Sequence, residues 1–173
     1  MMHKSDPYGF TLLELLWVLS ILAILLSAIV PHFSGALSQM GLENKAREIY
    51  MALAYVQQQA VNRNATFGLS FDLTAGHQEV TCYRNIGYDA YGQPILDPNN
   101  VLRNPVTKKF YLIAVDQGEP SGDMRLTEAD FGGNHWVEFN SLGEPNSQGR
   151  ITLAGAGSSH AITVSQIGRL TFE

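Results

Sequence analysis

The sequence predicts an α+β protein in which one long N-terminal helix packs on an antiparallel β-sheet head. Three observations lead to this expectation. An apolar run from Phe10 to Val30 contains a single charged residue, Glu14. The next stretch, residues 31–64, carries apolar side chains at helical spacing. From residue 65 to residue 173, short apolar segments alternate with Gly, Asn, Ser and Pro, as they do in antiparallel sheets.

The first segment, residues 10–30, is long enough to cross a bilayer. About 20 apolar residues span the roughly 30 Å hydrocarbon core of a membrane. The polar interruptions of this run are Thr11, Glu14, Ser20 and Ser27. Lys4 precedes the run, and no other Lys or Arg occurs before Lys45. Since positive charge marks the cytoplasmic side, we expect a single transmembrane helix with a cytoplasmic N-terminus and the remainder across the membrane.

Glu14 is the informative residue of this segment. A charged side chain near the centre of a transmembrane helix costs roughly 2.5–3.5 kcal/mol on insertion scales, so its presence indicates a function and a partner. The position of Glu14 near the start of the run lowers that cost, because the bilayer edge and the positive end of the helix dipole are both close.

Two alternatives concern the same segment. A secretory signal peptide is one, since Ser34-Gly35-Ala36 offers small residues for cleavage. The run is longer than the roughly 7–15 residues of a signal-peptide core, contains a carboxylate and follows a leader with one Lys, and these features argue against it. A plain membrane anchor is the other alternative, and it gives Glu14 no purpose.

The N-terminal residues also carry a family resemblance. Gly9 to Leu16 (GFTLLELL), followed by an apolar stretch that ends at Pro31, resembles the prepilin signature of type IV pilins and type II secretion pseudopilins. The resemblance implies that residues 1–9 are a leader, which a prepilin peptidase removes after Gly9. It implies that Phe10 becomes the N-methylated first residue and that Glu14 is the assembly carboxylate. The implied fold is the pilin fold.

The physics of such an assembly carboxylate is consistent. After cleavage, Phe10 carries an ammonium group in an apolar environment, and the carboxylate of a neighbouring, axially displaced helix is a suitable partner. Two buried charges are tolerated only when they are paired and hydrogen-bonded. The pair is therefore expected to set the register of docking more than to add net stability.

The second segment, residues 31–64, is expected to continue the helix. Pro31 lacks a backbone donor and should kink or loosen the helix at that point. The helix then resumes, because apolar residues recur at steps of 4 and 3 along one face: Leu42, Ala46, Ile49, Leu53, Val56 and Ala60. Together the two segments predict a helix of roughly 50 residues, about 75 Å long, whose second half packs on the head.

The head, residues 65–173, is predicted to contain about seven short strands. The first two are expected at Phe67–Phe71 and Glu79–Tyr83, on either side of a turn-rich stretch. The others are expected at Phe110–Val115, Trp136–Phe139, Arg150–Leu153, Ala161–Val164 and Arg169–Phe172. We see no internal repeat.

Two long connections, residues 84–107 and 116–134, are candidate recognition surfaces, because loops beyond roughly 12–15 residues are uncommon in compact domains unless they have a function. The second contains Asp116, Glu119, Asp123, Glu128 and Asp130 against Arg125 alone. Calcium would suit such oxygen ligands, but the spacing is not that of an EF-hand, so we expect a solvated acidic loop and no metal site.

The C-terminal sequence carries a second resemblance. Residues 137–143 (VEFNSLG), 150–153 (RITL) and 162–170 (ITVSQIGRL) are similar to the closing pattern of the GspH/FimT pseudopilin family, which includes Gly168 and Arg169. This implies a minor subunit of a pseudopilus or pilus near the tip. Some pilins of this family take up DNA through a Gly-Arg-x-Arg element. Here Thr171 stands in place of the second arginine.

Charge and residue usage argue against other classes of function. The chain has 11 Lys plus Arg against 16 Asp plus Glu, a net charge of −5, which is a poor electrostatic footprint for nucleic acid. Cys82 lies on an apolar strand pattern and is expected to be a core residue. The histidines show no metal-ligand spacing. We therefore expect no enzyme activity, no cofactor and no metal, although a triad formed in space would not show in sequence.

The function expected from these observations is that of a minor pseudopilin or pilin, which helps to initiate and assemble a filament in protein secretion or pilus formation. The expected location is a bacterial inner membrane, with one transmembrane pass and a periplasmic head. Its expected partners are other pilin-like subunits, a prepilin peptidase and an inner-membrane assembly platform. The sequence leaves open type II secretion or type IV pilus. Alternatives are a DNA-binding minor pilin and a membrane-anchored periplasmic enzyme.

Overall fold

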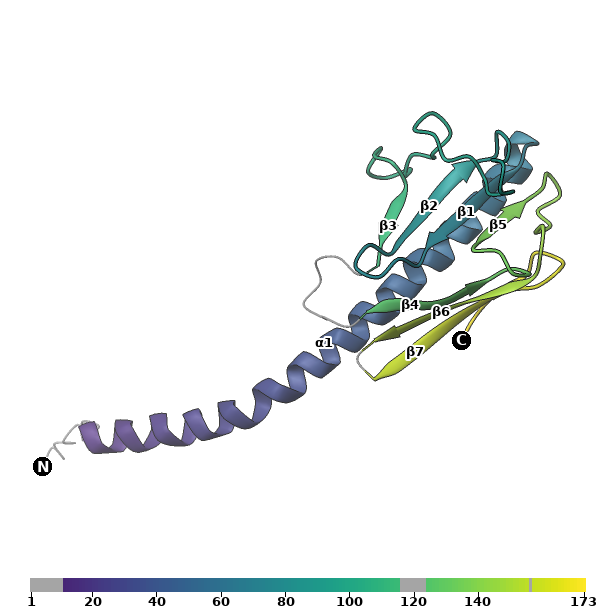
Figure 1. Ribbon diagram of the computed structural model, residues 1–173. Coiled ribbons are helices and arrows are strands. Elements are labelled where there is room, and N and C mark those ends of the chain that lie inside the picture. Colours follow the sequence, from purple (N-terminus) through teal and green to yellow (C-terminus); the bar gives the residue numbers. More distant parts are fainter. Residues whose placement is uncertain (1–10, 116–123, 156) are drawn as a thin grey trace, which may run out of the picture. The chain divides into compact units, whose positions relative to one another are not determined.

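The computed structural model describes residues 11–115, 124–155 and 157–173, except for the side chains of residues 27–36. Its first element is a single helix, α1 (Leu12–Arg63), of 52 residues (Figure 1). The prediction that the helix continues past Pro31 is thus confirmed. By contacts the chain divides into two units, Met1–Ala36 and Leu37–Glu173, and α1 contributes to both.

Both ends of α1 have a local explanation. At the start, the Thr11 side chain accepts a hydrogen bond from the Glu14 backbone N–H at 3.2 Å, which is the geometry of an N-cap. At the end, Asn64 adopts a left-handed φ of 47°, and the Ala65 N–H donates to the Ala60 carbonyl at 3.2 Å. Asparagine tolerates this conformation better than most residues, so the chain can leave the helix and enter the first strand.

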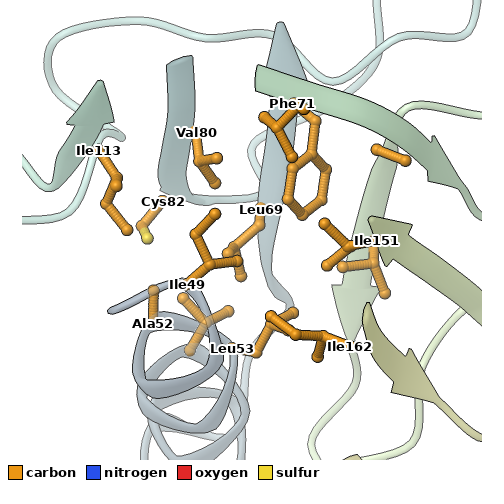
Figure 2. Packing of buried hydrophobic residues seen from close by; sticks show 14 of the residues in the cluster. Ile49, Ala52, Leu53, Leu69, Phe71, Val80, Cys82, Ile113, Ile151 and Ile162 are labelled. Carbon is orange, nitrogen blue, oxygen red and sulfur yellow. The ribbon is translucent and has the colours of Figure 1, made fainter. Parts of the chain in front are cut away.

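The second half of α1 buries one face completely. The residues predicted at steps of 4 and 3 are all 0% exposed: Leu42, Ala46, Ile49, Leu53, Val56 and Ala60. Ala52 is also 0% exposed. Figure 2 shows Ile49, Ala52 and Leu53 pointing from the helix toward apolar side chains of the head. The predicted amphipathic face is therefore confirmed.

The first sheet has four antiparallel strands in the order β3-β2-β1-β5. These are β1 (Phe67–Asp72), β2 (Glu79–Arg84), β3 (Leu112–Ala114) and β5 (Trp136–Phe139). In the central row, Leu69 pairs with Cys82 on one side and with Val137 on the other, and all three are fully buried. Alternation along β1 places Phe67, Leu69 and Phe71 in the core that α1 shares.

The second sheet also has four antiparallel strands, in the order β4-β6-β7-β8. These are β4 (Arg125–Asp130), β6 (Gly149–Gly155), β7 (Ser158–Val164) and β8 (Leu170–Phe172). Ile151 pairs with Ile162, and both are fully buried. Figure 2 shows these two residues converging with Leu53 and Leu69, so α1 and the two sheets form one core.

The structure corrects the sequence-based prediction of the second long connection. Residues 116–123 lie outside the described residues, but β4 occupies residues 125–130 within the predicted loop, so Glu128 and Asp130 belong to a strand. The strand was missed because its register shifts between Leu126 and Glu128, which places the two buried side chains, Leu126 and Ala129, three residues apart. A bulge of this kind breaks the alternation by which a strand is recognised. The described residues of the head therefore form eight strands in two sheets, where one sheet of about seven strands was predicted.

The first long connection, residues 84–107, which was predicted as a candidate recognition surface, has contacts with the core. The Leu102 N–H donates to the Cys82 carbonyl at 2.8 Å, and the Tyr111 N–H donates to the Leu102 carbonyl at 2.7 Å. Leu102 itself belongs to the core. The connection thus folds back onto β2, and its stretch up to residue 100 covers part of the head surface.

Candidate functional site

The N-terminal part of α1 exposes apolar side chains on all sides. From Leu12 to Leu26, every large apolar residue is between 48% and 84% exposed. Monomeric soluble proteins rarely expose apolar patches of this extent, so this segment requires a covering environment of lipid or protein. The residues are Leu12, Leu13, Leu15, Leu16, Trp17, Val18, Leu19, Ile21, Leu22, Ile24, Leu25 and Leu26.

Glu14 lies in the first turn of this apolar segment. Its backbone N–H donates to the side chain and to the carbonyl of Thr11, at 3.2 Å and 3.1 Å. The carboxylate therefore stands at the positive end of the helix dipole, where a negative charge is stabilised. No cationic side chain among the described residues pairs with it. The geometry leaves Glu14 available to a positive group from another molecule.

Other predicted residues of this region fall outside what the structure describes. Gly9 and Phe10, the predicted cleavage and methylation positions, are among residues 1–10. Pro31 has helical backbone, but its side chain is not described, so the predicted kink remains a prediction. No helix in the described ranges has the length and apolarity that a membrane crossing requires. Residues 10 and 27–30 of the predicted span are not fully described, and the span remains a prediction.

The C-terminal pattern forms a junction with α1. The Gln57 side-chain amide donates to the carbonyls of Gly143 and Gly168, both at 2.8 Å. Gly143 lies in the turn after β5, and Gly168 lies in the turn between β7 and β8. One side chain of the helix thus holds both turns, and each would otherwise present an unpaired carbonyl at a half-buried position.

Gly168 has a geometric reason to be glycine. Its φ is +79°, and a Cβ atom at this position would lie 2.3 Å from the Gly143 carbonyl oxygen and 2.7 Å from the Gln57 amide nitrogen. Neither contact is possible without movement of the two turns. The neighbouring Arg169 is exposed, and its backbone N–H donates to the Ser165 hydroxyl at 2.9 Å. The C-terminal Gly168-Arg169 pattern therefore packs the turn between β7 and β8 against α1. The Arg169 side chain has no partner among the described residues.

A buried carboxylate, Glu138, holds the outer face of the first sheet and was not predicted from the sequence. It is 3% exposed and accepts hydrogen bonds from the Tyr83 hydroxyl at 2.8 Å, the Asn85 amide at 2.8 Å and the Tyr88 hydroxyl at 2.6 Å. Burial, and next the adjacent carboxylate, raise the pKa of Tyr83, so its hydroxyl stays a donor. The cluster fastens the connection after β2 to the sheet.

Gly68 makes the Glu138 cluster possible. It pairs with Tyr83 on one side and Glu138 on the other, and a Cβ atom there would lie 2.7 Å from the Tyr83 hydroxyl. The absence of a side chain lets the hydroxyl reach across β1. A glycine inside a strand is the signal that could have indicated this close approach.

The groups considered for catalysis are engaged in packing. Cys82 is fully buried, and burial raises its pKa, so the reactive thiolate is disfavoured. The His135 Nδ1 atom lies 2.7 Å from the Ala129 carbonyl, and the His160 ring stacks on Phe172 with centroids 5.4 Å apart. Among the described residues, no group of three or more His, Cys, Asp or Glu could hold a metal ion.

Comparison with known families gives two matches. Residues 45–168 match the family model described as Type II transport protein GspH. Residues 5–30 match the model of the prokaryotic N-terminal methylation motif. A comparison with curated protein sequences found no match.

Comparison with solved structures indicates the same fold. The minor pseudopilin EpsH from the type 2 secretion system of Vibrio cholerae is 14% identical, with a TM-score of 0.53, and the match covers 76% of this chain and 95% of that one. The type IV minor pilin FimU of Pseudomonas aeruginosa is 15% identical, with a TM-score of 0.50, covering 78% and 90%. The predicted fold, a helix packed on an antiparallel head, is confirmed.

The junction at Gly168 gives the first prediction. Gly168→Ala should destabilise the head more than Gly76→Ala, by about 1–3 kcal/mol, because only the first substitution forces atoms into an occupied space. Gly76 is the matched control, since its φ is +82° and nothing lies within 4 Å of the added Cβ. Urea unfolding of the detergent-solubilised protein measures both. Equal destabilisation of the two variants would show that the close approach has no energetic weight.

Proposed function

This chain belongs to the GspH family of type II transport proteins, and from that membership we propose that it is a minor pseudopilin or minor pilin. The family and the fold are those of structural, pilin-like subunits. The role is filament initiation and assembly in protein secretion or pilus formation. The observation that carries the proposal is the exposed apolar start of α1 with Glu14 in its first turn.

The apolar start of α1 explains why the protein needs partners. Burial of apolar surface lowers the free energy by about 25 cal/mol per Å². The dozen large exposed side chains of this segment therefore favour its transfer out of water by many kcal/mol. A bilayer covers such a helix before assembly, and the apolar helices of other subunits cover it in a filament. The same surface therefore serves as an anchor and as a filament core.

Glu14 fixes the axial position of an apolar contact that would otherwise be nonspecific. Apolar surfaces slide past one another at little cost, but a carboxylate in lipid or in a dry core requires a partner. The methylated ammonium of Phe10 on a neighbouring subunit meets that requirement and fixes the axial offset. The N-cap at Thr11 keeps Glu14 within the first turn, close to where that ammonium would dock.

The head packs together with the second half of α1. Its two sheets share one core with α1, and Gln57 joins the C-terminal turns to the helix. In this proposal the protein is held in a bacterial inner membrane with its head in the periplasm, and a prepilin peptidase and an assembly platform act on it.

Processing at Gly9 gives the second prediction. Mass spectrometry of the membrane-derived protein should find a methylated N-terminal Phe10. Gly9→Val should block processing more strongly than the control Gly9→Ala, because a peptidase site shaped for glycine excludes the larger branched side chain more strongly. A mature N-terminus at Leu37 would instead indicate signal peptidase cleavage and refute the proposal.

The carboxylate gives the third prediction. Glu14→Leu should leave membrane insertion intact, since it removes a charge from lipid, but it should strongly reduce incorporation into filaments by leaving the Phe10 ammonium unpaired. Ser20→Leu is the matched control, because Ser20 is a polar residue of the same exposed segment that already bonds its own helix, through the Leu16 carbonyl at 2.8 Å.

Crosslinking to other pilin-like subunits and co-purification with filaments measure the incorporation of both variants. The control should incorporate as the unmodified protein does. If Glu14→Leu also incorporates normally, the carboxylate has no part in assembly.

A further inference from the structure

Three arginines line one cleft of the head, near the end of α1. The cleft has a volume of about 310 Å³, and its lining contains Arg63, Arg84 and Arg103 but no Asp or Glu. Two of its lining residues, Phe67 and Leu102, are apolar and buried. The cleft thus has three cationic lining residues in a protein whose net charge is −5.

The fold itself brings the first two arginines together. Arg63 ends α1, and the turn at Asn64 returns the chain so that its guanidinium carbon lies 5.9 Å from the centre of the Phe67 ring. Arg84 ends β2 and pairs in register with Phe67. Both arginines, which lie 21 residues apart in the sequence, therefore line the same cleft as Phe67.

The third arginine comes from the connection that folds back onto β2. The Arg84 N–H donates to the Asn100 carbonyl at 2.8 Å, and Val101 forms a bridge with Tyr83. These contacts place Arg103 beside the same cleft. Its guanidinium donates to the Lys108 carbonyl at 3.1 Å and lies 5.3 Å from the centre of the Phe110 ring. Each arginine is thus positioned by backbone that belongs to the fold.

Stability alone does not account for this convergence. Among the described residues the ion pairs involve Lys45, Arg47 and Arg150, and none of the three cleft arginines. The negative end of the helix dipole accounts for a cation at Arg63. It does not account for Arg84, and Arg103, although it contacts the Lys108 carbonyl and the Phe110 ring, has no counter-charge in the described part of the chain. Like charges that line one cleft without a counter-charge repel one another, and a bound anion reduces that repulsion.

We propose that this cleft binds an oxyanion of the phosphate class. The planar guanidinium group donates two parallel hydrogen bonds to phosphate oxygens, and arginine is less strongly hydrated than lysine, so it suits such sites. The volume accommodates a phosphate group and its nearest substituent. Tyr55 also lines the cleft. This inference does not depend on the assembly role.

Titration of the full-length protein in detergent tests the proposal. The probes are inorganic phosphate and a short single-stranded oligodeoxynucleotide, measured by calorimetry at several salt concentrations. Arg63→Gln, Arg84→Gln and Arg103→Gln should each weaken binding roughly tenfold, the effect of losing one charge-assisted contact. Arg125→Gln is the matched control, because Arg125 is an exposed arginine of β4 outside the cleft and loses the same charge.

The two probes distinguish the source of the phosphate. If the oligonucleotide binds, displaces inorganic phosphate and loses about one unit of salt slope per substituted cleft arginine, the ligand is a phosphodiester chain. If inorganic phosphate binds and the oligonucleotide does not displace it, the ligand is a small phosphate compound. Both outcomes support an anion site in the cleft.

Other outcomes overturn the proposal. Failure of both probes to bind refutes it. Equal weakening by Arg125→Gln shows that only overall charge matters. Binding of the oligonucleotide that is lost in Arg169→Gln but unchanged in the three cleft variants assigns the contact to the C-terminal Gly168-Arg169 element instead.

Discussion

The structure of the head depends on one constraint, the burial of a single face of α1 between two sheets. Leu42, Ile49 and Leu53 on this face are fully buried, and they contact a core to which both sheets contribute. Among the described residues, α1 is the layer that both four-stranded sheets share in this core. A sheet with one apolar face needs such a layer, so the helix is the element that lets both sheets fold. Its burial also sets which of its residues remain available for other contacts.

The burial of this face determines where two neighbouring polar residues of α1, Gln57 and Arg63, are directed. Gln57 is adjacent to the buried Val56 and is therefore directed at the turns that contain Gly143 and Gly168. Arg63, at the end of the same helix, is directed over Phe67. The packing of α1 on the sheets thus positions a residue at each of two features: Gln57 at the C-terminal turns and Arg63 at the arginine-lined cleft. In the proposed function, lipid or other subunits cover the apolar start of the helix.

The sequence predicted those features that are encoded by short-range patterns. The buried face of α1 follows a helical period, and most strands follow alternation. The roles of Gly9, Phe10 and Glu14, which belong to one contiguous motif, remain predictions. The sequence did not predict β4, because a bulge breaks the alternation there. It did not predict the roles of Gln57, Glu138 or the cleft arginines either. Each of these depends on segments that are distant in the chain, such as Tyr83 reaching Glu138 across Gly68, and no local period records such contacts.

The most direct test of this account compares two fragments, Leu37–Glu173 and Ala65–Glu173. The first retains the buried face of α1 and coincides with the second contact unit. The second lacks that face, whose Leu, Ile and Val side chains each contribute roughly 1.5–3 kcal/mol, a sum comparable to the roughly 5–15 kcal/mol stability of a domain. In thermal melts followed by circular dichroism, the longer fragment should unfold cooperatively and the shorter one should show no transition. Cooperative melts with equal midpoints would contradict the claim that α1 organises both sheets.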